Sequence, residues 1–200
     1  MIEVSGDIFD LAFQCKEPNI LLITTNGVWN SEGKAILGRG IAKTAKELFP
    51  QTPETLGTFL RMNYNRLKDR ARADVEEPWN IPYRIGMKGQ THIFSFPTKP
   101  TKITVTKTSI LPKYFSQRQM GMRIEGWKGF SLPSLIERSA KYISTLVGET
   151  PSLIERVFSI RPGCANGGLS WENQVKPLLE QYFTDDRFVI VERPYTGEHS

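Results

Sequence analysis

Two glycine-bearing stretches contain the residue types that can bind a phosphate. Gly38-Arg39-Gly40-Ile41 precedes a helical pattern, and Gly163-Cys164-Ala165-Asn166-Gly167-Gly168-Leu169 separates a strand pattern from a helical one. Glycine lets backbone N–H groups approach an anion, and the positive end of a helix dipole favours that anion. Neither stretch completes GxxxxGK[ST] or GxGxxG, so neither predicts a Walker A or a Rossmann site. Taken alone, either stretch could be no more than a tight turn.

A lysine follows an apolar strand pattern in Phe96-Pro97-Thr98-Lys99. A lysine at the end of a buried strand, near two anion-binding loops, can stabilise charge or act as a nucleophile. The alternative, a surface lysine that is merely solvated, is the more common meaning of a lysine taken by itself.

Short strand patterns alternating with helical patterns position these residues. The run from Asn19 to Thr25 contains four consecutive apolar residues, Ile20 to Ile23, as expected of a strand buried on both faces. A helix start is expected at Thr52, with its hydroxyl as cap and Pro53 in the first turn. Ser134-Leu135-Ile136-Glu137 has the form of a capping box. Further strands are expected at 3–4, 91–96 (halted by Pro97), 157–160 and 188–191, and helices at 40–49, 52–72, 134–147 and 171–183.

This alternation predicts an α/β fold of three layers, α/β/α, with a mixed, mostly parallel central sheet. Ligands of such sheets bind beyond the carboxyl ends of the strands. That rule selects the loops that follow Thr25, Phe96 and Ile160, which hold the two glycine-bearing stretches and Lys99. Two glycine loops at one edge of one sheet predict a diphosphate held from both sides.

The composition is that of a globular protein. The chain has 200 residues, 39% of them hydrophobic and 24% charged, which suits one domain spanning residues 1–200. No apolar run approaches the ~20 residues that a membrane span requires, and the N-terminus lacks the basic segment of a signal peptide. Cys15 and Cys164 form no CxxC pair, and the only histidines are His92 and His199. We therefore expect a cytoplasmic protein with no metal site and no cofactor.

The net charge is +5, and the positive charges are clustered. One cluster spans residues 61–72, and a second spans 99–128, where Tyr114, Phe115 and Trp127 lie among the cations. Basic residues interleaved with aromatic ones are typical of single-stranded nucleic-acid binding. For 61–72 a solvated helix face is the slightly favoured alternative. For 99–128 nucleic-acid binding and a long loop with charged side chains are evenly balanced.

Together these motifs resemble the macrodomain family. Gly6-Asp7-Ile8-Phe9 resembles its opening motif, in which the Asp accepts a hydrogen bond from the adenine amino group and the next backbone N–H assists. Asn26 and the first glycine stretch resemble the loop that holds the distal ribose and a phosphate, and the second stretch resembles the other phosphate loop. The resemblance runs from residue 3 to about residue 193 and implies an ADP-ribose site.

Within that family the closest resemblance is to the branch of the terminal ADP-ribose protein glycohydrolase and of the antitoxin that removes ADP-ribose from thymidine in DNA. The resemblance implies that Lys99 is catalytic and that Asn26 orients the distal ribose. The protein glycohydrolase has a catalytic Asp where this chain has Gly167, which favours the antitoxin-like arrangement. Long insertions are expected at about 27–37 and 100–130, and Tyr195 is a candidate to stack on adenine.

The leading functional hypothesis is hydrolysis of an ADP-ribosyl linkage on nucleic acid or protein by a monomer. The alternatives are a non-catalytic ADP-ribose reader, a hydrolase of ADP-ribose-1″-phosphate or O-acetyl-ADP-ribose, and a nucleic-acid-binding domain that uses the basic clusters alone. The last predicts no affinity for ADP-ribose and a steep dependence on salt.

Overall fold

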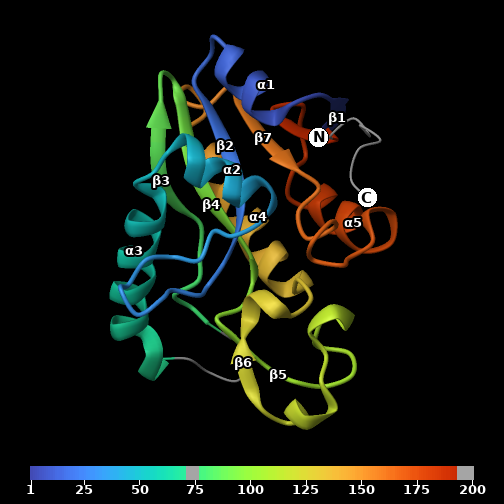
Figure 1. Ribbon diagram of the computed structural model, residues 1–200. Helices are drawn as coiled ribbons and strands as arrows, with labels where there is room; N and C mark the ends of the chain where they lie inside the picture. Colours follow the sequence, from blue (N-terminus) through green and yellow to red (C-terminus); the bar gives the residue numbers. More distant parts are fainter. Residues whose placement is uncertain (71–76, 193–200) are drawn as a thin grey trace.

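The computed structural model describes residues 1–70 and 77–192. The main elements, in chain order, are β1 (Ile2–Ser5), α1 (Ile8–Gln14), β2 (Asn19–Asn26), α2 (Gly40–Leu48), α3 (Thr52–Leu67), β3 (Tyr83–Lys88), β4 (Thr91–Lys99), β5 (Lys102–Thr104), β6 (Arg123–Glu125), α4 (Pro133–Glu149), β7 (Arg156–Ile160), α5 (Lys176–Glu180) and β8 (Phe188–Glu192) (Figure 1). Arg72, the predicted end of the helix that starts at Thr52, and Tyr195, the candidate for stacking on adenine, lie outside the described ranges.

The central sheet has six strands in the order β1-β8-β7-β2-β4-β3. The neighbouring strands β1 and β8, β8 and β7, β7 and β2, and β2 and β4 pair in parallel. Strand β3 pairs with β4 in the antiparallel direction. The predicted mixed, mostly parallel sheet is therefore confirmed. The parallel order brings the carboxyl ends of β1, β8, β7, β2 and β4 to one edge, where the loops of interest begin.

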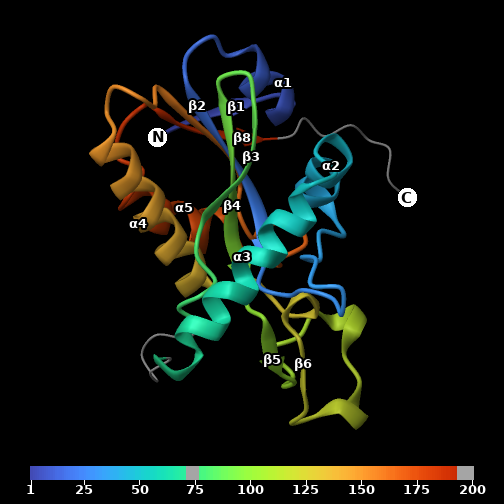
Figure 2. The same ribbon diagram turned by 90° about the vertical axis from the view of Figure 1, so that its left-hand side faces the viewer.

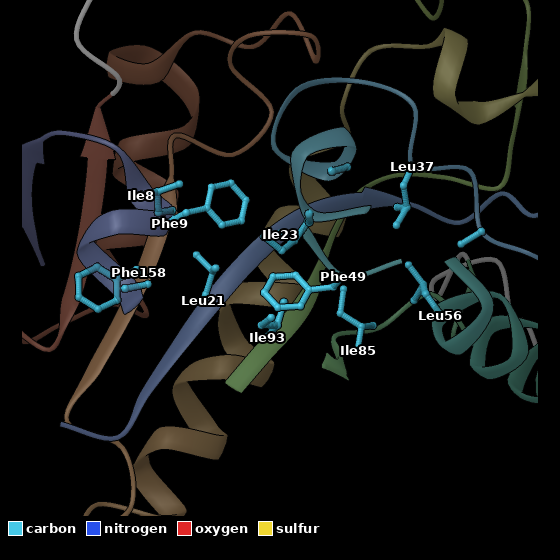
Figure 3. Close-up of a cluster of buried hydrophobic side chains, with 14 of the residues drawn as sticks. Ile8, Phe9, Leu21, Ile23, Leu37, Phe49, Leu56, Ile85, Ile93 and Phe158 are labelled. Atoms are coloured by element: carbon cyan, nitrogen blue, oxygen red, sulfur yellow. The ribbon is translucent and has the colours of Figure 1, made fainter. Parts of the chain in front are cut away.

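Helices cover both faces of the sheet, as Figure 2 shows with the sheet nearly edge-on between α4 and α5 on one side and α1, α2 and α3 on the other. Strand β2 explains why both faces are covered. Leu21 and Ile23 point into the core beneath α1 and α2, whereas Ile20 and Leu22 point into the core beneath α4, and all four are fully buried. Figure 3 shows the first of these cores, in which Phe49 and Phe158 pack near the two strand residues. The predicted α/β/α layering is confirmed.

Strand β4 does not stop at Pro97, contrary to the prediction, but continues through Lys99. Its neighbour β3 pairs with it only as far as Ser95, so the missing N–H of Pro97 lies where the strand has a single partner. On the other side Pro97 stays in register with Thr25 of β2. The extra residues carry Lys99 to the end of the sheet.

Two predicted helix caps are wrong. Helix α4 begins at Pro133 with Leu132 as its N-cap, and no side chain caps it, because the leucine side chain has no acceptor atom. The Leu132 N–H, which the acid of a capping box would accept, is bound to Thr98 O of β4 at 2.9 Å. The Glu137 carboxylate instead accepts the Tyr182 hydroxyl at 2.8 Å. At α3 the Thr52 hydroxyl donates back to Phe49 O rather than capping its own helix.

Other boundaries also differ. Helix α3 ends at Leu67 and passes into a short 3-10 turn, and the expected helix 171–183 is a π-helical turn, Trp171–Val175, followed by α5. Elements α1, β3, β5 and β6 were not predicted. Strands β5 and β6 form a small antiparallel pair within residues 100–130 and lie beyond the carboxyl end of β4 in both ribbon views (Figures 1 and 2). Among the described residues, no helix is both long enough and apolar enough to cross a membrane.

Candidate functional site

A cavity of about 350 Å³ opens at the carboxyl edge of the sheet. Its walls come from the ends of β2, β4 and β7, from the start of α2, and from the segment between β5 and α4. The loops that the sequence selected after Thr25, Phe96 and Ile160 thus meet in one place. Both glycine-bearing stretches and Lys99 contribute to the walls.

The first glycine stretch leads directly into α2. Gly40, the first helical residue, has a φ of 54°, a left-handed conformation that glycine adopts without strain. Arg39 is the N-cap and makes no side-chain capping bond, and the first turn contains no acid. The N–H groups of Gly40, Ile41 and Ala42 have no acceptor within the described part of the chain. They remain available to an anion at the positive end of the helix.

Asn26 shapes this loop with its side chain. Its amide Nδ2 donates to Ile36 O at 2.8 Å, and its Oδ1 accepts the Val28 N–H at 2.9 Å. These bonds hold the two ends of the loop of residues 27–37 together, so that Gly38 lies at the edge of the sheet. Asn26 lines the cavity, but both ends of its amide already have protein partners.

The second glycine stretch forms the opposite wall. Gly163 and Gly168 have φ values of 78° and 73°, the left-handed backbone conformation that glycine adopts easily. The N–H groups of Ala165, Asn166 and Gly167 have no acceptor among the described residues. The two loops approach each other closely, because a Cβ placed on Gly40 would lie 3.5 Å from Asn166 Nδ2. Two stretches whose N–H groups lack an acceptor in the described part of the chain therefore line one cavity.

Gly167 has no room for a side chain. A Cβ there would lie 2.2 Å from both Gly163 O and Ser131 Oγ. Ser131 also holds the loop from below, since its N–H donates to Gly167 O at 2.9 Å. The Ser131 hydroxyl is buried and has no hydrogen-bond partner among the described residues. In this chain a buried serine occupies the space into which a larger residue at position 167 would project.

Lys99 stands between the two loops, and the register of the sheet pairs it with Asn26. Its Nζ donates to three backbone carbonyls: Gly129 O at 2.8 Å, Asn166 O at 2.8 Å and Trp127 O at 3.2 Å. Burial, together with the nearby positive charges of Lys113 and Arg39, lowers the pKa of Lys99 to about 8. Three acceptors of this kind bind the ammonium form, and they tie the segment before α4 to the second glycine loop.

A buried turn supports the backbone around Lys99. The Lys99 carbonyl accepts bonds from Asn80 Nδ2 and from Gly27 N, and both oxygens of the Glu77 carboxylate accept the Thr101 N–H, at 2.7 and 2.8 Å. Desolvation raises the pKa of Glu77. Arg138 donates to the carbonyls of Glu77 and Asn80 and so fixes the turn to α4. These bonds set where β4 ends.

The mouth of the cavity is aromatic and positively charged. Tyr114 and Trp127 meet edge to face with their ring centroids 5.3 Å apart. The Arg39 guanidinium lies 5.8 Å from the Tyr114 centroid, and Lys113 Nζ lies 5.3 Å from it. None of the described residues that line the cavity is an Asp or a Glu. The cavity is therefore electrostatically suited to an anion.

Some residues of the predicted site lie elsewhere. Asp7 is exposed and caps α1, its Oδ1 accepting the Phe9 and Asp10 N–H groups at 2.8 and 3.2 Å. Its second oxygen stays free among the described residues, so its role toward adenine remains a prediction. The other residues that do not line the cavity are Ile8, Cys164, Gly168 and Leu169. Burial raises the pKa of Cys164 to about 11, so this thiol stays protonated at neutral pH.

Sequence reasoning missed Ser131, the carbonyls that hold Lys99, and the Glu77–Asn80 turn. Nothing in the pattern around Ser131 marks it, because its importance depends on the distant Gly167. Tyr114 and Trp127 did carry a signal, since both belong to the basic-aromatic segment. No group of three or more His, Cys, Asp or Glu side chains that could hold a metal ion occurs in the described ranges.

No protein-family model and no curated protein match this sequence. Solved structures do share its architecture. DarTG of Thermosipho africanus, solved in complex with ADP-ribose, aligns with a TM-score of 0.60 at 20% identity over 99% of this chain and 42% of that one. This chain thus spans less than half the length of that protein.

Two further structures align with this chain over nearly the full length of both chains. The macrodomain of Mycobacterium tuberculosis DarG aligns with a TM-score of 0.57 at 20% identity over 94% of this chain and 95% of that one. The macrodomain of Thermus aquaticus DarG aligns with a TM-score of 0.57 at 19% identity over 96% and 97%. With the sheet order and the two-sided helical cover described above, these matches show that the chain has the macrodomain fold that its motifs predicted.

Proposed function

We propose that this chain binds ADP-ribose in the cavity and hydrolyses an ADP-ribosyl linkage on nucleic acid. The observation that carries the proposal is the pair of free N–H sets, at Gly40–Ala42 and at Ala165–Gly167, which face each other across the cavity. A diphosphate offers oxygens on two sides and matches donors arranged in this way. The ADP-ribose bound to the Thermosipho africanus protein of the same fold supports this ligand.

The place of Lys99 supports a catalytic role at the distal ribose, next to Asn26. An ammonium has no lone pair with which to attack C1″, and the three carbonyls around Nζ stabilise the ammonium. A group with a pKa of about 8 is, however, a competent general acid at neutral pH. In the proposed step a water oxygen bonds to C1″ as the bond from C1″ to the base breaks. Lys99 releases one of its three carbonyl acceptors and gives that proton to the departing atom, and the proton of the water passes to solvent.

This assignment predicts the pH dependence of kcat/KM. The lowered pKa of Lys99 means that its ammonium is present below about pH 8 and is lost above it. We expect kcat/KM to be level up to about pH 7.5 and then to fall about tenfold per pH unit. Release of ADP-ribose from an ADP-ribosylated oligonucleotide, followed from pH 6 to pH 10, measures this limb. A rate that instead rises through pH 8 would mean that the neutral amine attacks the sugar.

The segment of residues 100–130 favours nucleic acid over protein as the group to which ADP-ribose is attached. It contains six Lys or Arg residues and one acid, Glu125, so its net charge of +5 equals that of the whole chain. It supplies Tyr114 and Trp127 to the cavity mouth. Cations and aromatic rings together suit phosphates and stacked bases. Parallel release assays on ADP-ribosylated single-stranded DNA and on ADP-ribosylated protein test this choice.

A second candidate is a reader that binds ADP-ribose without turnover. The lack of a carboxylate among the described residues of the cavity wall favours it, because no acid is placed there to activate water. Saturable binding of ADP-ribose with no release from DNA, from protein or from O-acetyl-ADP-ribose would select the reader. Phosphate release from ADP-ribose-1″-phosphate would select a small-molecule hydrolase instead.

A further inference from the structure

Several cations line the cavity, and none of the described residues in its walls is an acid. Lys99, Arg39 and Lys113 all line it, and the last two lie within 6 Å of the Tyr114 ring centroid. Neither Arg39 nor Lys113 has an ion-pair or hydrogen-bond partner among the described residues. By contrast Arg161, at the β7 side of the cavity, is neutralised by Glu3 at 3.0 Å and by Glu192 at 2.7 Å.

Lys113 comes from a different segment than the two N–H sets, whereas Arg39 directly precedes the first of them. Those sets belong to the loops after β2 and β7, whereas Lys113 and Tyr114 come from the segment that follows β4. In the sheet order β7-β2-β4, Lys99 at the end of β4 lies on the side of β2 away from β7, and Lys113 lies near enough to Lys99 to help lower its pKa. A ligand whose diphosphate lies between the N–H sets and whose distal ribose reaches Lys99 therefore leaves the cavity past Tyr114 and Lys113.

We propose that Lys113 and Arg39, held around the Tyr114 ring, form a binding site for a backbone phosphodiester of the nucleic acid that carries the ADP-ribose. The inference rests on the proposed function and adds to it a subsite at the mouth of the ADP-ribose pocket. A phosphodiester carries one negative charge and two free oxygens, so it can accept from an ammonium and a guanidinium together. A bound phosphodiester would offset the electrostatic repulsion between Lys99 and the two cations Lys113 and Arg39.

The test compares two probes that differ only in phosphodiesters: ADP-ribosylated thymidine, and a single-stranded oligothymidylate with the same modification on one base. Dissociation constants are measured in a Lys99→Ala background, so that the probes are not consumed. The unsubstituted Lys113 protein is expected to bind the oligonucleotide more tightly than the nucleoside. Lys113→Ala should weaken oligonucleotide binding about fivefold and lower the slope of log affinity against log salt by about 0.7, as loss of one phosphate contact predicts.

Lys107→Ala is the matched control, because it removes the same charge from an exposed residue of the same segment that does not line the cavity. It should leave the preference for the oligonucleotide almost unchanged. Equal loss of affinity for both probes, or for free ADP-ribose, in Lys113→Ala would overturn the proposal, as would an unchanged salt slope. If the unsubstituted protein binds neither ADP-ribose nor either probe, the proposed function itself fails, which is a different result.

Discussion

Replacing Lys99 with alanine is expected to lower the rate of ADP-ribose release about 10³-fold while changing the affinity for ADP-ribose by less than about threefold. The loss follows from removal of the proposed proton donor beside C1″. The affinity is expected to persist because the diphosphate is held by backbone N–H groups on either side of Lys99, not by the amine. Turnover is measured on an ADP-ribosylated oligonucleotide and affinity by calorimetry.

The substitution also frees three carbonyls that Lys99 now binds, so a structural role has to be separated from a chemical one. Lys99→Arg is the control for this. Arginine keeps the positive charge and several N–H donors for the carbonyls, but its pKa is too high for it to give up a proton. We expect Lys99→Arg to bind ADP-ribose and to be nearly as inactive as Lys99→Ala. Turnover close to that of the unsubstituted protein in either variant would remove Lys99 from the mechanism.

Replacing Gly167 with alanine is expected to weaken ADP-ribose binding at least about 100-fold. The new Cβ would lie 2.2 Å from the Gly163 carbonyl, which is backbone and cannot turn aside, so the second loop has to move. The N–H groups of Ala165, Asn166 and Gly167 would then no longer point at the diphosphate together. Losing two hydrogen bonds to a charged group, at about 1.5 kcal/mol each, accounts for a loss of this size.

Gly148→Ala is the matched control, since this exposed glycine of α4 has open space where its Cβ would stand. It should bind ADP-ribose normally and unfold at a slightly higher temperature, because alanine favours the helix. The melting temperature of Gly167→Ala shows whether the loop or the whole fold is affected. Normal affinity in a folded Gly167→Ala protein would show that the second loop does not hold the ligand.

The parts of the site that the sequence predicted are those set by strand periodicity and by glycine. Asn26 and Lys99 end two adjacent parallel strands, so an apolar run followed by a polar residue was enough to bring them together. Gly40 and Gly163 have left-handed φ values, which glycine adopts most easily, and their glycines marked both phosphate loops in advance. Local chemistry and a fixed repeat determine these features.

The parts that were missed depend on contacts between segments far apart in the chain. Residues Ser134 to Glu137 match the capping-box pattern, but α4 begins one residue earlier, next to the hydrogen bond from the Leu132 N–H to Thr98 O. Pro97 ends a strand in most local contexts, yet here β3 has already separated from β4. Ser131 matters only because Gly167 packs on it. No window of neighbouring residues contains that information.

Calorimetric titration with ADP-ribose shows whether the two glycine loops bind the single ligand proposed for both of them. We predict saturable binding of one ADP-ribose per chain, at least about tenfold tighter than that of AMP under the same conditions, because AMP lacks the second phosphate and the distal ribose. This prediction would be contradicted if ADP-ribose gave no binding heat while unmodified single-stranded DNA bound in a salt-sensitive way and was not displaced by ADP-ribose. The chain would then be a nucleic-acid-binding domain in which the two loops are only turns.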